Sequence, residues 1–572
     1  MSGAEANPDS PRRTTLAELL LHCRQSLQGG NYLMAYDQAT RARNLGFESR
    51  ALDYLWLLAL ANAGSTQLAL KRFRELGLSE GDAEEDWLAL EGRLLKDLAL
   101  VGGSDARALY LRSGEAYHAA FLRTGGYFTA INAATMLLLG GREEQALVLA
   151  RDVLARILKF DAANETDDYY LRVTEAEAAL LLGDIERCRA SLRRADGLLH
   201  GNLNVRSRTA AQLRLICRHV GIGEDLLNAL TLAPVIYVQR PTQAELDALP
   251  VPALPAEASF VFSGLTQPAE LYVVEHFQSR QARLHLVLPD TRSALLDHWQ
   301  RHHGAGWAMR LSRCLDQADE ISIAHGFLDD EDAWCADYVS AMAYGLSRLA
   351  AKRLGSRWLA IESTPHPRRE NACDLPRERT VEGPEPAHDA EYERRFIGTL
   401  FADFAGFSRL SDAEMPQFQS LFIGSIATML KRWREKILLQ HTWGDAVHVV
   451  TVDAESTADI AAEIQAIVDR VRPRLSGTLA QLELRLAAHY APVYSGIDPV
   501  EDTPTFFGSQ LSFTARIEPV TPPGMIFVTE AFAARLALEA PERFVVEYAG
   551  EIELAKRFGK YRLFSLRRLA AA

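Results

Sequence analysis

Two acidic residues stand at predicted strand ends in the last third of this 572-residue chain. Asp403 closes a hydrophobic strand within 396–412 and precedes a turn at Gly406, where exposed N–H groups and a helix start could bind a phosphate beside a cation. Asp445 lies in the tight turn of a predicted strand-turn-strand segment, 437–453. Either acid alone is more typical of a turn or capping residue. Two such carboxylates in one sheet can hold two Mg²⁺ ions around an in-line phosphoryl reaction.

A third segment, 506–534, offers a cation and a hydroxyl group on one helical face. Gly508 is expected to open a short helix, and Pro519 to begin its end. Ser512 and Arg516 are four residues apart, so both side chains project toward a common target. A guanidinium beside a small hydroxyl donor suits a phosphoryl group that accumulates negative charge. Standing alone, this arginine would be interpreted as a surface residue paired with a local acid.

The elements that must position these residues are predicted to be mixed α and β. After the strand that ends at Asp403, we expect a turn through Gly406 and a helix capped by Ser411. In the second segment, Val447 and Val449 alternate toward one face of a strand. A strand and a further helix follow the short helix of the third segment.

Together, and in this order, the three segments resemble the catalytic domain of class III adenylate and guanylate cyclases, over residues 394–568. The motifs that carry the resemblance are FADFAGFSRLS, TWGDAVHVV, TARIEPVTPPG and ELAKRFGKYRLFSL. The resemblance implies an α+β, ferredoxin-like domain and a phosphorus-oxygen lyase activity that converts a nucleoside triphosphate to a 3′,5′-cyclic nucleotide and pyrophosphate. It also implies two Mg²⁺ or Mn²⁺ ions per active site, and a homodimer with the active site between the two chains.

The resemblance further implies roles for single residues. Asp403 and Asp445 would ligate the metal ions, and the Phe404 carbonyl group would complete one metal site. Arg516 would stabilise the pentavalent α-phosphate, with Ser512 as its catalytic neighbour. Lys556 or Lys560 would neutralise the triphosphate. The other positions expected to contact the substrate are Phe404, Gly406, Phe407, Ser408, His441 and Thr505.

Three of these positions depart from the family pattern. Ser512 stands where the family commonly has an asparagine that orients the ribose, and a serine hydroxyl reaches less far. His441 and Thr505 stand where a lysine and an aspartate normally select the purine. Base preference is therefore open among ATP, which we favour, GTP and a pyrimidine triphosphate. The alternative function is a catalytically weak or inactive cyclase-like protein that acts as a signalling scaffold or adaptor.

The chain before this region divides into further sections by its patterns. Residues 15–230 read as successive helices with a small residue five positions after recurrent glycine turns, which is typical of a degenerate tetratricopeptide-like array. The pairs are Gly30 with Ala35, Gly64 with Ala69, Gly141 with Ala146, and Gly183 with Cys188. The array could hold a protein partner or serve only as a scaffold. With a middle section and the C-terminal motifs, it is similar to bacterial multidomain cyclases with tetratricopeptide repeats or a TRAFs-binding domain.

Residues 231–362 predict a small Rossmann-like α/β domain. Its expected strands lie at 234–239, 259–263, 282–288, 320–324 and 356–362. Gly264 is the only glycine in the turn after the second of these strands, so we expect no dinucleotide site and favour a structural or sensing module. Residues 363–393, with five prolines, predict a solvated linker that lets the flanking parts move. Residues 1–14 are expected to be disordered.

Composition limits the classes of function. The 62 basic and 75 acidic residues give a net charge of −13, which argues against a nucleic-acid partner. The six cysteines form no C-x-x-C pair, which favours a reduced environment. The sequence has neither the apolar region of a signal peptide nor about 18 uninterrupted apolar residues, so we expect a cytoplasmic protein with no membrane partner.

Overall fold

A computed structural model of the chain describes residues 15–28, 31–80, 84–102, 105–157, 159, 163–196, 198, 203–238, 255, 257–324, 333–361, 392–498, 500, 502–554 and 559–569. The predicted disordered segment 1–14, residues 363–391 of the predicted linker and the candidate Lys556 lie outside these ranges. Among the described helices, none has the length and apolar composition needed to cross a bilayer.

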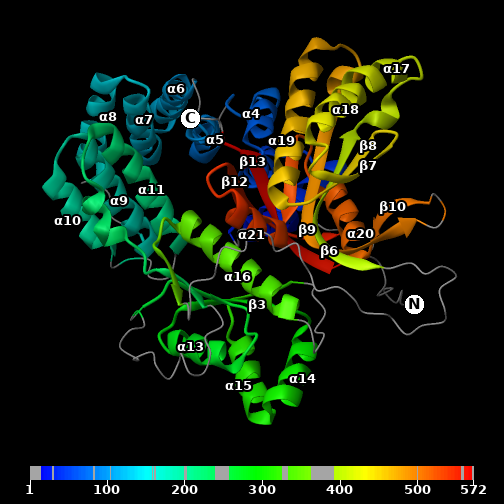
Figure 1. Cartoon of the computed structure of the whole chain (residues 1–572). Coiled ribbons are helices and arrows are strands. Elements are labelled where there is room, and N and C mark those ends of the chain that lie inside the picture. The colour runs from blue at the N-terminus through cyan, green and yellow to red at the C-terminus, as the bar shows by residue number, and fades with distance from the viewer. Residues whose placement is uncertain are drawn as a thin grey trace, which may run out of the picture.

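Helices that pack against their neighbours along the chain form the N-terminal part (Figure 1). They are α1 (Leu16–Gln28), α2 (Tyr32–Asn44), α3 (Arg50–Asn62), α4 (Thr66–Glu75), α5 (Glu85–Leu100), α6 (Ala106–Thr124), α7 (Tyr127–Leu139), α8 (Glu143–Ile157), α9 (Glu165–Leu181), α10 (Ile185–Asp196), α11 (Leu203–Val220) and the 3₁₀ helix η1 (Glu224–Leu230). The small residues predicted to pack after the turns, Ala35, Ala69, Ala146 and Cys188, are all fully buried. A larger side chain at these positions would push the paired helices apart.

A five-stranded parallel sheet follows, in the order β4-β3-β2-β1-β5. Its strands are β1 (Val235–Val238), β2 (Phe260–Ser263), β3 (Arg283–Leu288), β4 (Glu320–Ile323) and β5 (Trp358–Ile361), at the five places where the sequence predicts strands. Helices α13 (Pro268–Gln278), α14 (Arg292–His303) and α15 (Ala305–Asp316) cover one face. The long helix α16 (Ala333–Leu354) lies on the other face.

The C-terminal part contains an eight-stranded sheet in the order β12-β13-β11-β9-β6-β8-β7, with β10 paired to β9. The strands are β6 (Glu393–Ala405), β7 (Ile437–Trp443), β8 (Ala446–Thr451), β9 (Glu483–Asp498), β10 (Thr503–Phe507), β11 (Met525–Thr529), β12 (Phe544–Leu554) and β13 (Gly559–Arg568). The helices are α17 (Met415–Phe418), α18 (Gly424–Leu430), α19 (Ala454–Val471), α20 (Ser509–Ile517) and α21 (Glu530–Glu539). The central order β9-β6-β8-β7, with helices after β6 and β8, is the ferredoxin-like arrangement.

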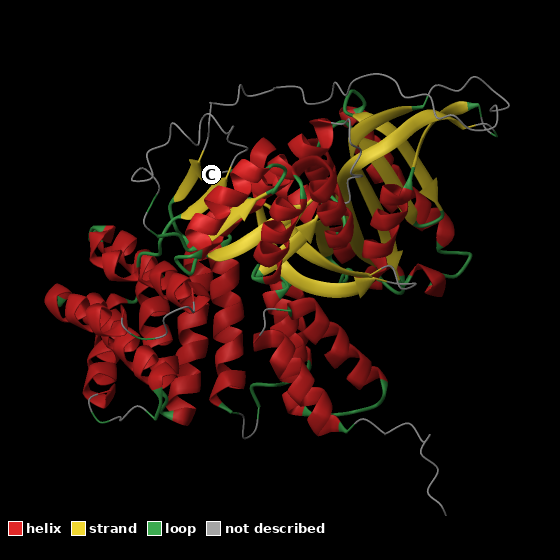
Figure 2. Ribbon diagram, turned by 90° about the horizontal axis from the view of Figure 1, so that it is seen from below, coloured by secondary structure: helices red, strands yellow, loops and turns green. Residues whose placement is uncertain are grey.

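The two faces of the eight-stranded sheet are covered by different elements. On one face, α18, α19 and α21 share a core with the strands. The opposite face carries α20, with helices of the N-terminal array beside it. The core on that face contains Leu33 and Ala63 from the array, Phe513 and Ile517 from α20, and Ala487, Met525 and Phe527 from β9 and β11. Figure 2 shows the helical array to one side of the sheets.

Glycines permit the close approach of the array to the eight-stranded sheet. A Cβ atom at Gly550 of β12 would lie 2.8 Å from the backbone nitrogen of Leu33. A Cβ atom at Gly64, which follows α3, would lie 2.7 Å from Oγ of Ser565 on β13. Because real Cβ atoms essentially never approach so closely, both positions exclude a side chain unless the interface opens.

The two sheets are joined through α16 and α21, which pack together between them (Figure 1). Gly345 of α16 lies so close to α21 that an added Cβ atom would overlap the carbonyl oxygen of Ala534. The buried residues of α16 belong to the same continuous core as those of α21 and the C-terminal sheet. The parts before and after the predicted linker are therefore packed against each other, and the movement predicted from the linker stays a prediction.

Candidate active site

Asp403 and Asp445 lie next to each other at one end of the eight-stranded sheet. Strand β6 pairs with β8, and Ala402 stands opposite Val447. Gly444, with φ +64°, and Asp445 form the two-residue turn between β7 and β8, which returns this acid toward the end of β6. Burial, the charge of Asp403 and a hydrogen bond between the two carboxyl groups raise the pKa of Asp445 to about 6. The fold therefore holds two half-buried carboxylates in mutual repulsion.

A third carboxylate, Glu518, stands near this pair. Glu518 follows α20, and its Oε1 lies 3.8 Å from Nη1 of Arg485 on β9. Arg485 stands opposite Asp403 on the paired strand β6. Burial and the charges of Asp403 and Asp445 raise the pKa of Glu518 to about 7, and Arg485 opposes the shift. The sequence analysis missed Glu518 and Arg485. The pairing of β6 with β9 brings Arg485 to Asp403, and the packing of α20 and the turn after it on both strands brings Glu518 there. No spacing in the sequence indicates these contacts.

Ser512 and Arg516 lie on α20, as the sequence predicts. Phe513 and Ile517 anchor the inner face of α20, whereas Ser512 is exposed and Arg516 is half-buried. The helix packs on β9 and β6 and ends at Glu518, close to the acidic pair. The structure thus places the arginine helix and the two acids on the same face of one sheet.

The loop after Asp403 partly follows the prediction. Gly406 has φ +94°, a left-handed conformation that favours glycine, and a short 3₁₀ turn with Phe407 and Ser408 follows it. The Phe404 side chain is buried against Phe418 and Phe422, so its carbonyl group is the part available to a ligand.

One local prediction in these segments was wrong, and another is confirmed. Helix α17 begins at Met415 with Glu414 as its N-cap residue, whereas Ser411 was expected to cap it; Ser411 instead donates hydrogen bonds of 2.8 and 2.9 Å to the Glu414 carboxylate. The prediction that Val447 and Val449 point to one face of β8 is confirmed, since both belong to the core that α18, α19 and α21 share with the strands. The strand is nevertheless buried on both faces from Val447 to Thr451. β8 lies between β6 and β7, and layers on both sides cover it.

Aromatic side chains surround the turn that carries Asp445. His441 is exposed on β7 and stacks on Trp443 with ring centres 5.7 Å apart. Trp443 in turn stacks on His448, which stacks on Phe401 of β6. Trp443 remains 58% exposed. This aromatic surface beside the acids offers flat faces suited to a nucleobase or to a second protein surface.

One chain does not bring Thr505 and Lys560 to the acids. Thr505 of β10 stands opposite Gly496, eleven residues along β9 from Arg485, which is about 35 Å of extended strand. Lys560 lies on β13, and β11 and β9 separate that strand from β6. Within a single chain, these candidates are therefore not part of the site at Asp403 and Asp445.

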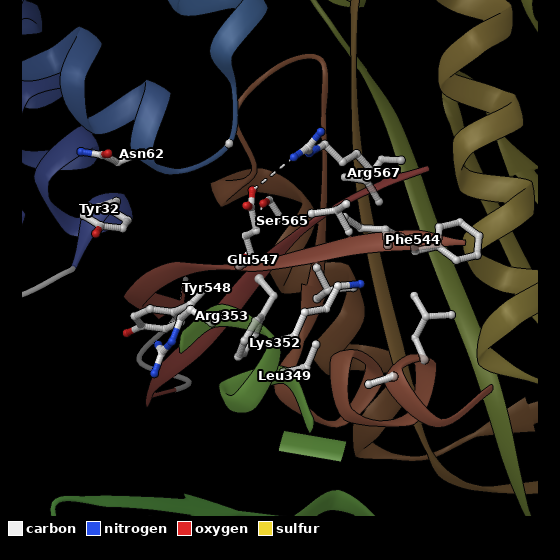
Figure 3. A pocket seen from close by; sticks show the side chains of 18 of the residues that line it. Tyr32, Asn62, Leu349, Lys352, Arg353, Phe544, Glu547, Tyr548, Ser565 and Arg567 are labelled. Carbon is white, nitrogen blue, oxygen red and sulfur yellow. Dashed lines mark hydrogen bonds and ion pairs between the residues drawn. The ribbon is translucent and has the colours of Figure 1, made fainter. Parts of the chain in front are cut away.

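A large cavity lies elsewhere in the described part of the chain. It has a volume of about 1800 Å³ and lies between the helical array, α16 and the strands β12 and β13 (Figure 3). Tyr32, Arg353 and Tyr548 line it, and Glu547 and Arg567 form an ion pair across its wall. None of the predicted site residues lines this cavity.

The acidic pair fits a divalent cation. Within the described ranges, no group of three or more His, Cys, Asp or Glu side chains is arranged to hold a metal ion by itself. Asp403 and Asp445 are hard oxygen donors, and a cation between them would offset the repulsion that raises the pKa of Asp445. Its remaining ligands would come from a backbone carbonyl group, water or substrate phosphates, as is usual for Mg²⁺.

The comparisons with known proteins match separate parts of the chain. A family described as Tetratricopeptide Repeats-Sensor matches residues 31–137. No curated protein sequence matches the chain. The adenylyl cyclase CyaB from P. aeruginosa is a similar solved structure, with 16% identity over 32% of this chain and 100% of that chain, and a TM-score of 0.27.

Two guanylyl cyclase structures match to a similar extent. The guanylyl cyclase Cya2 has 18% identity over 31% of this chain and 94% of that chain, with a TM-score of 0.27. The catalytic core of a rhodopsin-guanylyl cyclase with converted specificity, in complex with ATPαS, has 19% identity over 32% of this chain and 100% of that chain, with a TM-score of 0.26. Because these TM-scores are low, the function of this chain must be inferred from its own residues.

Proposed function

We propose that residues 394–568 form a nucleotide cyclase that converts a nucleoside triphosphate, with ATP favoured, to a 3′,5′-cyclic nucleotide and pyrophosphate. The observation that carries this proposal is the pair of half-buried carboxylates at Asp403 and Asp445, whose mutual repulsion a divalent cation would relieve. Helix α20, with Ser512 and Arg516, lies on the same sheet face.

Different residues of the chain would have different roles in such a reaction. Bound Mg²⁺ or Mn²⁺ would lower the pKa of the ribose 3′-hydroxyl group and neutralise phosphate charge. Asp403, Asp445 and the Phe404 carbonyl group would hold these ions. Arg516 donates hydrogen bonds to the α-phosphate while the 3′-oxygen bonds to phosphorus and the bond to the pyrophosphate oxygen breaks. Ser512 donates one hydrogen bond that orients the ribose.

A homodimer would complete the site. Thr505 and Lys560 are remote from the acids of their own chain, so they can serve the site only if they come from a second copy. The arm formed by β9 and β10 also exposes large apolar side chains that a second copy would cover. They are Tyr494 (38% exposed), Ile497 (49%) and Phe507 (39%), together with Tyr392 (54%), which precedes β6 and packs against Phe507.

The N-terminal parts would regulate this activity. Leu33 and Ala63 of the array share a core with Phe513 and Ile517 of α20. A ligand or protein partner that shifts the first helices would therefore act directly on the helix that carries Arg516.

The test is to supply the purified chain with each of the four ribonucleoside triphosphates and Mn²⁺, and to identify products by mass. We expect a cyclic nucleotide and pyrophosphate in equal amounts, and no product from Asp403→Asn under the same conditions. A folded protein that forms no cyclic product from any triphosphate would refute the proposal. It would instead favour a cyclase-like scaffold, in which the array and sheets serve only as binding surfaces.

A further inference from the structure

His489 links helix α20 to strand β11 through two hydrogen bonds. It lies on β9 and is 3% exposed. Its Nδ1 is 2.8 Å from Oγ1 of Thr529, the last residue of β11, and its Nε2 is 3.0 Å from Oε1 of Gln510, the second residue of α20. Ser512 and Arg516 follow Gln510 by two and six residues on the same helix. One buried imidazole thus ties the first turn of α20 to the end of β11.

The donors and acceptors of this link are complete. The Gln510 carbonyl oxygen can only accept, so Nε2 of His489 donates to it. A neutral imidazole then accepts at Nδ1 from the Thr529 hydroxyl group. The Thr529 oxygen also accepts from the backbone N–H of Phe532 at 3.2 Å and so caps α21. Because hydrogen bonds are directional, this link restrains the orientation of α20 relative to β11 as well as the distance between them.

The start of α21 is also where the five-stranded sheet meets the C-terminal part. Glu530, next to Thr529, lies 3.4 Å from Nε of Arg562, and the Arg562 guanidinium also donates to Glu320 of β4. Glu320 lies 3.2 Å from Nδ1 of His285 on β3. Arg562, Glu530 and His285 are 20%, 11% and 4% exposed at their side chains. Glu320 is 31% exposed, and these partly buried ion pairs favour one relative position of the two sheets.

Hydrophobic contacts alone would hold α20 less specifically. Its inner residues Phe513 and Ile517 contact the sheet core, and such contacts are not directional. The link through His489 adds the directional restraint at the start of the helix. A displacement of about 1 Å in a group that stabilises a transition state can reduce the rate about 100-fold.

We infer that His489 is a positioning residue for the proposed reaction, and that through it the docking of the five-stranded sheet at α21 sets the position of α20 and of Arg516. This inference rests on the proposed function. It assigns to His489 no contact with substrate or metal.

The first experiment removes the link in two ways. His489→Phe deletes both hydrogen bonds within the core, and Gln510→Leu deletes one of them at a half-buried position that tolerates an apolar side chain. For both, we expect kcat to fall between about 10-fold and 100-fold while KM for the metal-nucleotide changes by less than about threefold. Amide hydrogen exchange in residues 512–517 should be faster than in the unmodified chain.

A matched control separates positioning from general loss of stability. Thr457→Val removes the buried hydrogen bonds of Thr457 with Thr451 and the Asp453 carbonyl group, at the start of α19 and on the face of the sheet opposite α20. It should lower the melting temperature without altering kcat or exchange in α20. His489→Phe and Gln510→Leu with unchanged exchange in 512–517 and unchanged kcat would overturn the positioning role. If the unmodified chain forms no cyclic product, the proposed function fails, whereas the exchange measurement still decides the link.

The second experiment tests whether sheet docking acts through His489. Glu320→Gln weakens the ion pair with Arg562 at the contact between the sheets. In the unmodified background, we expect it to speed amide exchange in residues 512–517 at least twofold. In the His489→Phe background, the same substitution should have no further effect, because the link is already broken. If Glu320→Gln speeds amide exchange in residues 512–517 equally in both backgrounds, the contact between the sheets affects α20 through residues other than His489. That result would overturn this part of the inference.

Discussion

At the residue scale, the site depends on two carboxylates that the backbone forces together. The ordinary pKa of an aspartate is 3.8, and in the fold that of Asp445 is about 6 because of burial and Asp403. Between pH 3.8 and 6, Asp445 is therefore mostly ionised in the unfolded chain but mostly protonated in the folded chain. The stability linked to this group is complete below pH 3.8 and is lost as pH rises through 6. A bound cation reverses this penalty, so metal binding and stability should rise together.

Asp403→Asn and Asp445→Asn should each reduce cyclic product formation to background, because each removes one charge from the metal site. In EDTA at pH 7.5, Asp445→Asn should melt at a higher temperature than the unmodified chain, since the repulsion with Asp403 is gone. This gain should disappear near pH 4. Mg²⁺ should raise the melting temperature of the unmodified chain only. Undiminished turnover in either variant, with an unchanged circular dichroism spectrum, would contradict the metal role.

His441 and Thr505 should set the base preference, because they occupy the positions that face the nucleobase in the resembled family. The double variant His441→Lys, Thr505→Asp should shift the ratio of kcat/KM for ATP over GTP by about tenfold, since a hydrogen bond to a charged group contributes about 1.5–3 kcal/mol. Competition among all four triphosphates measures the ratio. An unchanged ratio would mean that these residues do not contact the base.

His448 should make the C-terminal part sensitive to acid. Burial and the nearby His441 lower its pKa from 6.5 to about 4. The unfolded chain therefore binds a proton that the folded chain does not, and stability should be lost as pH falls from 6.5 to 4, by up to about 3 kcal/mol. His448→Phe should reduce the difference in melting temperature between pH 7.5 and 5.0. The control His219→Gln, at an exposed position, should keep the full difference; an equal loss in both variants would exclude His448 as the cause.

At the scale of elements, the contact between α16 and α21 is the point where a small change should have the largest effect. Gly345 has no room for a Cβ atom because the Ala534 carbonyl oxygen occupies that space. A methyl group there must push the two helices apart or bend one of them. Since α21 begins next to Thr529 and Glu530, the displacement would reach both the ion pairs with β4 and the link to α20.

Gly345→Ala should destabilise the chain by about 1–3 kcal/mol, as for other overpacked cores, and should reduce cyclase activity. Gly306→Ala is the matched control: Gly306 lies in α15 with nothing within 4 Å of an added Cβ atom. In this open helical position, alanine should be neutral or stabilising by up to about 1 kcal/mol. Thermal melting and product formation compare the two. Equal melting temperatures for both variants would show that α16 and α21 separate without cost.

At the scale of the whole molecule, one face of the eight-stranded sheet serves three purposes. The acids and aromatic residues lie at its β6-β8-β7 end, α20 covers β9, and the first helices of the array cover β11 and the strands beyond it. The exposed arm of β9 and β10 and the remote positions of Thr505 and Lys560 favour completion by a second chain. The array therefore leaves uncovered the β6-β8-β7 end of this face, where the acids lie and where the proposed second chain would bind.

Mixing two inactive variants should restore activity if the site lies between chains. Arg516→Ala alone should lose on the order of 10²-fold in rate, as for loss of a charged transition-state donor, and Asp403→Asn should be equally impaired. If Arg516 of each chain serves the acids of the partner chain, a mixed dimer has one site with intact acids and an intact arginine. With complete subunit exchange, about half of the dimers are mixed, and activity should recover to about a quarter of the unmodified value. A mixture that stays inactive despite demonstrated exchange would place the site within one chain or exclude catalysis.

The sequence alone determined much of the local structure. Apolar runs and turn residues predicted the strands of the five-stranded sheet and β6, β7, β8 and β11 of the eight-stranded sheet, but not β9, β10, β12 and β13. The small residues after glycine turns predicted the buried contacts of the array, such as Ala35 and Cys188. Asp403, Asp445 and Arg516 stood out because their residue types and spacings are suited to metal and phosphate chemistry. These features depend on neighbours within a few positions along the chain, so a single sequence contains them.

Only the tertiary structure decided which of these elements meet. Arg485 joins the acids because β6 pairs with β9, and Glu518 joins them because α20 and the turn after it pack on both strands. His489 links α20 to β11 because both elements contact β9. Leu33 packs beside Phe513 across nearly 500 positions, and Gly345 fits against Ala534 because two helices from different parts of the chain share a core. Such contacts depend on shape complementarity between surfaces that form only after each element has folded. Spacing along the chain indicates no such complementarity, and for this reason the sequence predicted the acids but not the residues that surround and position them.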